Sequence, residues 1–126
     1  MPLDAVEKAT VVMLSGYGAT MLGNPDTLNK AMLPKLEGNK GANVVSRFAG
    51  SFIACNAAML VATKDADAET KRKVAAVQAA TFATGALLTA TAVTDDVVGQ
   101  PKGVKIFNIA QSAVMAGLLL KKALDK

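Results

Sequence analysis

Long uncharged stretches alternate with short charged segments along this chain. The longest stretch runs from Val74 to Thr94, with the basic run KRK before it and two aspartates after it. A helix rises about 1.5 Å per residue, so a stretch of about 20 residues covers the roughly 30 Å hydrocarbon core of a bilayer. A surface helix of a water-soluble protein needs a charged face, and this stretch has none. The pattern therefore predicts a membrane-spanning helix.

Three further helices are predicted by the same reasoning. The four helices cover approximately residues 4–23, 44–63, 72–94 and 103–123. Asp4, with Glu7 three residues later, suits a capping box at the start of the first helix. Gly23-Asn24-Pro25 should end it, because Gly and Asn accept the left-handed conformation and Pro cannot continue the hydrogen-bond ladder.

A polar connection follows the first helix. Asp26 or Thr27 is expected to cap a short amphipathic helix that lies at the membrane surface with Leu28 and Met32 on its apolar side. The predicted fold is therefore all-α: residues 1–126 form a single membrane domain, a four-helix transmembrane bundle with short loops and a short interfacial helix between the first two long helices.

Small side chains recur every four residues on the first three predicted helices, a spacing that lets membrane helices approach closely. Three such faces in one chain favour a tight bundle. The predicted packing residues are Ser15, Ala19 and Gly23 in the first helix, Ser46, Gly50, Ala54 and Ala58 in the second, and Ala79, Ala83 and Gly85 in the third.

Composition narrows the range of functions. The chain has no His, which removes the commonest general base and metal ligand, and its lone Cys55 allows no intrachain disulfide. The net charge of +4 comes from basic residues scattered at the ends of apolar runs, without the basic, aromatic-rich face of a nucleic-acid binder. We therefore expect no enzyme, no metal site and no nucleic-acid partner.

Five polar residues are expected at membrane depth. Arg47 could bind an anion or a lipid headgroup or form a salt bridge with a partner, or it could snorkel to the interface from near the helix start. Asn56, Gln78, Asn108 and Gln111 could form hydrogen bonds between helices or ligate the metal of a tetrapyrrole. The sequence requires no cofactor, and bound lipid or pigment would be compatible with it.

The order of these features resembles the DoxX-like group of small four-helix membrane proteins. The matching residues are Asn24-Pro25, which break the chain after the first helix, and Arg47-Phe48-Ala49-Gly50 near the start of the second. The outline covers most of the chain, but its Ala-rich composition differs from that of a typical member. Members include accessory membrane subunits of quinone-linked oxidoreductases, so the resemblance implies a fold more than a function.

Three functions remain open at this point. The first is a non-enzymatic accessory subunit that packs against other subunits of a larger membrane complex, photosynthetic or respiratory, in a thylakoid, inner mitochondrial or bacterial inner membrane. The second is a small transporter or ligand-binding membrane protein that uses Arg47 and the buried amides. The third is a soluble Ala-rich helical bundle. The balance of Lys and Arg between the two ends favours termini on the stromal, matrix or cytoplasmic side.

Overall fold

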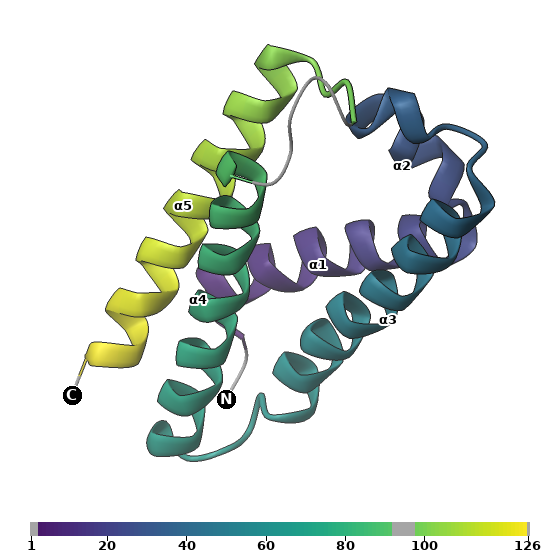
Figure 1. The fold of residues 1–126 in the computed structure, drawn as a ribbon. Coiled ribbons are helices and arrows are strands. Elements are labelled where there is room, and N and C mark those ends of the chain that lie inside the picture. The colour runs from purple at the N-terminus through teal and green to yellow at the C-terminus, as the bar shows by residue number, and fades with distance from the viewer. Residues whose placement is uncertain (1–2, 92–97, 126) are drawn as a thin grey trace.

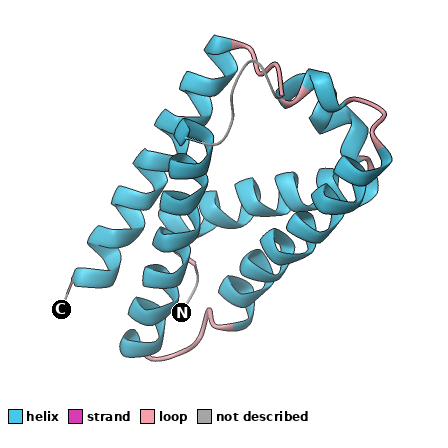
Figure 2. Cartoon of the chain, viewed as in Figure 1, coloured by secondary structure: helices cyan, strands magenta, loops and turns pink. Residues whose placement is uncertain are grey.

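The computed structural model describes residues 3–91 and 98–125, and throughout that part of the chain all regular structure is helical (Figure 2). This confirms the all-α prediction, including a short helix after the first long one. The elements are α1 (Ala5–Gly23), α2 (Pro25–Met32), the 3₁₀ turn η1 (Pro34–Leu36), α3 (Lys40–Ala62), α4 (Ala68–Thr91) and α5 (Lys102–Leu124). The end predicted for the third long helix, residues 92–94, lies outside the described residues.

The first helix begins as predicted and ends at the predicted place for a different reason. The Asp4 carboxylate accepts from the Glu7 backbone N–H at 2.8 Å, and the Glu7 carboxylate accepts from the Asp4 N–H at 2.8 Å. At the other end Asn24 has φ −146°, so it is not left-handed. Its side chain instead accepts from the Thr27 N–H at 3.4 Å, so Asn24, and not Asp26 or Thr27, caps α2.

Two later helices begin four residues earlier than predicted because the chain supplies caps there. The Asn39 side chain accepts from the Ala42 N–H at 2.9 Å and starts α3 at Lys40. Asp67 accepts from the N–H of Thr70 at 2.8 Å and from its hydroxyl at 2.9 Å, just before α4. Residues 68–71, which lie before the predicted start of the third long helix, are therefore helical.

Only three of the described helices are long and apolar enough to cross a membrane: α3, α4 and α5. The predicted number of four spanning helices is therefore wrong, and α1 is the exception. It has 19 residues, carries Glu7 and Lys8 near its start, and continues through the polar run SGYG. Its charged first turn shortens the apolar part below the length that a bilayer requires.

The long helices pack as two pairs, α1 against α3 and α4 against α5, and only a few contacts join the pairs (Figure 1). In this view α1 crosses at a steep angle to α4 and α5, so the arrangement is more open than the predicted tight bundle. Both termini lie at the same end of the molecule. A small core joins the four helices through Leu14, Ala57, Ala79, Phe82, Met115 and Leu119.

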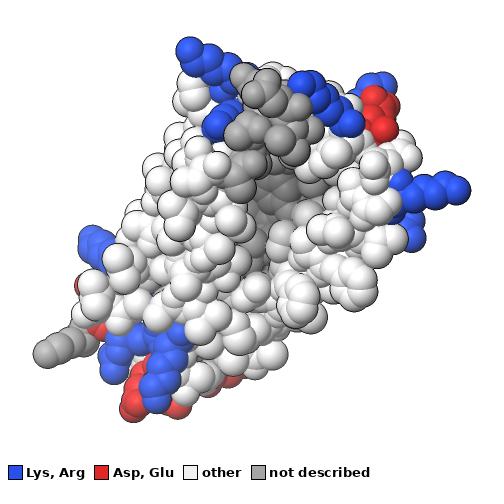
Figure 3. Space-filling view, in the orientation of Figure 1, with Lys and Arg blue, Asp and Glu red and all other residues white. Residues whose placement is uncertain are grey.

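The charged side chains of residues 3–91 and 98–125 lie at the two ends of the molecule (Figure 3). The segments 9–25, 48–63, 74–91 and 106–120 contain no charged residue. Figure 3 shows the Lys, Arg, Asp and Glu side chains gathered at the upper and lower-left ends, with an uncharged band between them. Within this band Thr81, Thr89 and Thr91 donate their hydroxyls to the carbonyl four residues earlier, at 2.7–3.0 Å, so these polar groups are satisfied inside their own helix.

Candidate functional site

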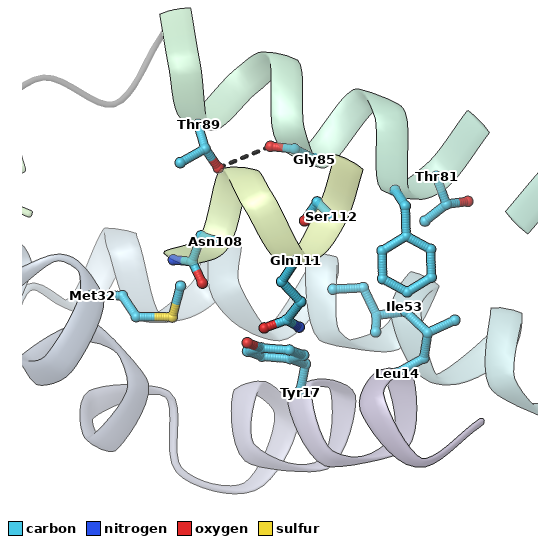
Figure 4. Close-up of a pocket in the computed structure, with 11 residues that line it drawn as sticks. Leu14, Tyr17, Met32, Ile53, Thr81, Gly85, Thr89, Asn108, Gln111 and Ser112 are labelled. Atoms are coloured by element: carbon cyan, nitrogen blue, oxygen red, sulfur yellow. Dashed lines mark hydrogen bonds between the residues drawn. The ribbon is translucent and has the colours of Figure 1, made fainter. Parts of the chain in front are cut away.

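A cavity of about 170 Å³ lies where the two helix pairs meet. Figure 4 shows the 11 residues that line it, which come mainly from α1, α4 and α5. None of them is charged. The apolar part of the wall consists of Leu14, Met32, Ile53 and Phe82, with Gly85 leaving an open position on α4.

The polar part of the wall lies mostly on one side of the cavity. Asn108 and Gln111 both face it from α5, consistent with their spacing of three residues. The amide of Gln111 lies over the ring of Tyr17 in Figure 4. The Asn108 Nδ2 atom is buried and has no hydrogen-bond partner among the described residues. The Asn108 Nδ2 is therefore an unsatisfied donor that is closed off from the cavity space.

The other two predicted amides join the helix pairs instead of lining the cavity. Gln78 on α4 is fully buried, and its Nε2 donates to the Asn56 carbonyl on α3 at 3.0 Å. The Asn56 side chain in turn donates to the Phe52 carbonyl at 3.0 Å. Of the two uses considered for these amides, the structure shows the interhelical hydrogen bond.

Arg47 lies away from both groups of amides. It is exposed in the second turn of α3 and borders a shallow surface pocket with Leu22, Phe48 and Ser51. The structure therefore does not bring Arg47 together with Asn108 and Gln111, as a shared ligand site would require.

The closest helix contact is between α1 and α3, at two glycines. A Cβ atom added to Gly50 would lie 2.7 Å from the Met21 Cβ and 3.1 Å from the Gly18 carbonyl oxygen. One added to Gly18 would lie 3.0 Å from the backbone nitrogen of Ala54. Gly50 and Ala54 were among the predicted packing residues. Gly18 was not, although its position three residues after Ser15 could have suggested a second face.

The remaining predicted packing residues take several different positions. Ser15, Ala19 and Ala58 border an open groove between α1 and α3, whereas Gly23 is exposed with nothing near its Cβ position. On α4, Ala79 is buried in the core, Ala83 is exposed, and Gly85 lines the cavity. Ser46 is buried.

Ser46 belongs to a polar contact that the sequence did not reveal. Its hydroxyl donates to the Asn29 Oδ1 at 3.3 Å, and the Asn29 Nδ2 donates to the Asn43 Oδ1 at 2.9 Å. Asn29 is only 1% exposed, so these bonds fix α2 against α3. An asparagine in the middle of a short helix is a weak signal, because such residues usually face solvent.

A charged group at the end that carries both termini was also missed. Lys122 near the end of α5 contacts the carboxylates of Asp4 and Glu7, with 3.0 Å between its Nζ and the Glu7 Oε1. Burial raises the pKa of Asp4, but the hydrogen bonds from Lys122 and from the Glu7 N–H outweigh it, so that this pKa lies below the ordinary value of 3.8. The contact ties α1 to α5.

These arrangements consist of helix packing, hydrogen bonds between helices and an uncharged cavity. The cavity holds amides, hydroxyls and a phenol. In residues 3–91 and 98–125, no three acidic or cysteine side chains gather closely enough to hold a metal ion. Comparison of the chain with protein-family models, with curated proteins and with solved structures gives no match. The DoxX-like resemblance stays a prediction from the sequence.

Proposed function

We propose that this protein is a small multi-pass membrane protein in which α3, α4 and α5 cross the bilayer, and that it is a non-enzymatic accessory subunit packed against a larger membrane complex. The observation that supports this most is the uncovered apolar surface of the three helices. Within the most apolar 18-residue segment of each helix, only 22% is buried inside the chain for α3, 28% for α4 and 17% for α5.

The exposed side chains are large. Phe48 and Phe52 on α3 are 66% and 70% exposed, and Phe107 on α5 is 62% exposed. In water, contiguous apolar surface of this extent is unusual and marks a site of association. In a bilayer the same residues face acyl chains or neighbouring subunits at no such cost, and the charged residues at the two ends reach the interfaces.

The accessory role is supported by how little of the apolar surface this chain buries by itself. Its helices have outward apolar faces along most of their length, and its two helix pairs touch at few points. A neighbouring subunit would cover part of these faces and hold the pairs together. Three crossings put the start of α3 on one side of the bilayer and the C-terminus and the turn between α3 and α4 on the other. In this proposal the side with the C-terminus is the cytoplasmic, stromal or matrix side.

Cys55 provides a direct test of the membrane location. It is the only cysteine, it is exposed on α3, and it lies in the middle of the uncharged segment 48–63. In permeabilised native vesicles, a membrane-impermeant maleimide should not label Cys55 until detergent is added. The matched control is Lys64→Cys in a Cys55→Ala background, which should be labelled without detergent. Equal labelling at both positions would favour the soluble bundle.

The accessory role needs a separate experiment. A tagged chain purified from native membranes in mild detergent should elute with other membrane proteins in a particle much larger than its own 12.9 kDa. The same membranes dissolved in a strongly denaturing detergent provide the control, because specific partners should then be lost. A monodisperse monomer with no associated protein in mild detergent would contradict the role while leaving the membrane location intact.

A further inference from the structure

The groove between α1 and α3 is apolar and open along its length. Its volume is about 580 Å³, within the roughly 300–1,000 Å³ that ligand sites usually have. Ser15 is the one polar residue that lines it, and the other lining residues are Ala, Leu or Val. The helical segments that form the groove, within residues 9–25 and 48–63, carry no charge. Such a groove suits a hydrocarbon chain.

A second pocket adjoins the groove on the side of the start of α3. It is lined by Leu22, Val44, Arg47, Phe48 and Ser51. Leu22 borders both pockets. Ser51 follows Arg47 by four residues and precedes Ala54 by three, so both pockets use the same face of α3. Together they extend about 22 Å along α3, from Arg47 to Ala62, with a cation at one end and no charge beyond it.

The Arg47 cation has no ion pair with a carboxylate in residues 3–91 and 98–125. The two carboxylates in the connection between α1 and α3 are engaged elsewhere. Glu37 lies 4.0 Å from the Lys30 Nζ, and Asp26 accepts from the Gly38 N–H at 3.1 Å. The described part of the chain therefore leaves the charge of Arg47 to be balanced from outside.

The position of Arg47 along α3 indicates where the balancing charge lies. Arg47 is about 10 Å from Lys40, the first residue of α3, and directly precedes the uncharged segment 48–63. A cation at this depth in a bilayer is costly unless it is paired or reaches the interface. Side chains on a helix lean toward its N-terminus, so the guanidinium of Arg47 extends toward the interface at the start of α3. That is the level of the lipid phosphates.

Lys40 adds a second cation to the same face. It precedes Arg47 by about two helical turns and is exposed. It likewise has no ion pair within residues 3–91 and 98–125. A headgroup with a net negative charge is attracted by both cations, whereas a zwitterionic headgroup brings a cation of its own. The charge on this face therefore favours an anionic lipid.

We propose that this face of α1 and α3 binds one anionic phospholipid. Its phosphate accepts hydrogen bonds from the guanidinium of Arg47, which matches phosphate oxygens in a bidentate geometry, and one of its acyl chains lies in the groove. The proposal rests on the proposed membrane location and not on the accessory role.

Native mass spectrometry of the full chain, released from mild detergent after its lipids are removed, counts the lipids that bind. We would titrate phosphatidylglycerol and, separately, phosphatidylcholine with the same acyl chains. One molecule of phosphatidylglycerol should bind saturably and about tenfold more tightly than phosphatidylcholine. Inorganic phosphate, which offers the anion without an acyl chain, should not displace it.

Two variants separate the headgroup contact from the groove. Arg47→Gln should weaken the binding of phosphatidylglycerol about tenfold and reduce its advantage over phosphatidylcholine. Ala58→Phe adds bulk to the groove and should weaken the binding of both lipids while leaving the cation in place. The matched control is Lys102→Gln, which removes a positive charge at the start of α5, outside both pockets, and should change neither affinity.

Four outcomes would overturn the proposal. Equal affinities for the two lipids in the unchanged protein would show that no anion is recognised, and this comparison holds even if a variant fails to fold. Displacement of the lipid by inorganic phosphate would show a site for a free anion. Equal losses in Arg47→Gln and Lys102→Gln would show attraction by overall charge, and unchanged binding in Ala58→Phe would exclude the acyl chain from the groove. None of these outcomes alters the labelling of Cys55, so failure of the lipid site and failure of the membrane location are distinguishable.

Discussion

The two helix pairs are held together by opposite means. α1 and α3 meet backbone to backbone, where Gly18 and Gly50 leave no side chain between the helices. α4 and α5 instead supply large side chains to the core, where Phe82, Met115 and Leu119 are nearly or fully buried. The α1–α3 contact therefore depends on the lack of a side chain at two positions, whereas α4 and α5 contribute side chains that fill the core.

This difference matters because the pairs share few contacts. Besides the small core, the described links are the Gln78–Asn56 hydrogen bonds and the contacts of Lys122 with Asp4 and Glu7, at the end that carries the termini. At the opposite end the Lys35 N–H donates to the Val98 carbonyl at 3.1 Å. The α1–α3 pair should consequently be destabilised by larger side chains at its glycines, and the α4–α5 pair by smaller side chains in the core.

Truncation of a core side chain on α5 should have the largest effect on stability. Leu119 on α5 is 0% exposed, so Leu119→Ala should lower the free energy of unfolding by about 2–4 kcal/mol, as is usual for large-to-small substitutions in a core. Leu120→Ala is the matched control, because Leu120 is 51% exposed and its loss leaves no internal void. Denaturation in mixed micelles, followed by helix content, measures both. Similar losses at the two positions would contradict the packing of α5.

Enlargement of a glycine at the α1–α3 contact should have the next largest effect on stability. Gly50→Ala places a methyl group against the Met21 Cβ and two backbone atoms of α1, and should cost about 1–3 kcal/mol. Gly16→Ala on α1 has no atom within 4 Å of its new Cβ and should instead stabilise the helix by about 0.5–1 kcal/mol. Opposite signs in the same unfolding assay would support the glycine contact, and a gain from Gly50→Ala would disprove it.

Loss of the ionic contact between the pairs should have a smaller effect. Lys122→Gln leaves the Glu7 carboxylate, whose side chain is 5% exposed, without its cation, at an expected cost of about 1–2 kcal/mol. Lys121→Gln, at the exposed neighbouring position, should change stability by less than about 0.5 kcal/mol. Chemical denaturation of the two variants side by side would show whether only position 122 matters.

Lowering the pH should produce the smallest change in stability. The pKa of Asp4 is lower when the protein is folded, so the stabilisation from its ionised form is complete above the ordinary value of 3.8 and is lost as the pH falls through the folded pKa. Asp4→Asn keeps a good helix cap and removes the charge, so the midpoint of thermal unfolding should depend less on pH below about 4 in this variant. Identical pH profiles for the two proteins would rule out this contribution.

The sequence predicted the helices better than it predicted their contacts. The capping box at Asp4 and Glu7 and the end of α1 at Gly23 were read from local residue types, because caps and helix breakers act within one turn. Asn24 and Asn39 were not identified as caps, since several polar residues in each connection could serve. The spanning length of α1 was overestimated because its charged first turn was counted with the apolar part.

The sequence identified polar residues of the site but did not predict which residues they contact. The spacing of Asn108 and Gln111 placed them on one face of a helix, but it could not show that Tyr17 lies opposite them or that Gln78 reaches Asn56 instead. The small-residue pattern selected Ser15 and Ala19 on α1, whereas the contact uses Gly18. An Ala-rich helix has small residues on several faces, so spacing alone does not determine which face is used.

The sequence by itself determined that the chain is helical and where charge is absent, because these properties depend on residues a few positions apart. It predicted four membrane-spanning helices, and the structure has three that are long and apolar enough. Only the tertiary structure decided that α1 pairs with α3 and α4 with α5, that a cavity remains between the pairs, and that Lys122 meets Asp4. These contacts join positions far apart in the chain, and the crossing angles that create them depend on which side chains are small enough to let two backbones approach.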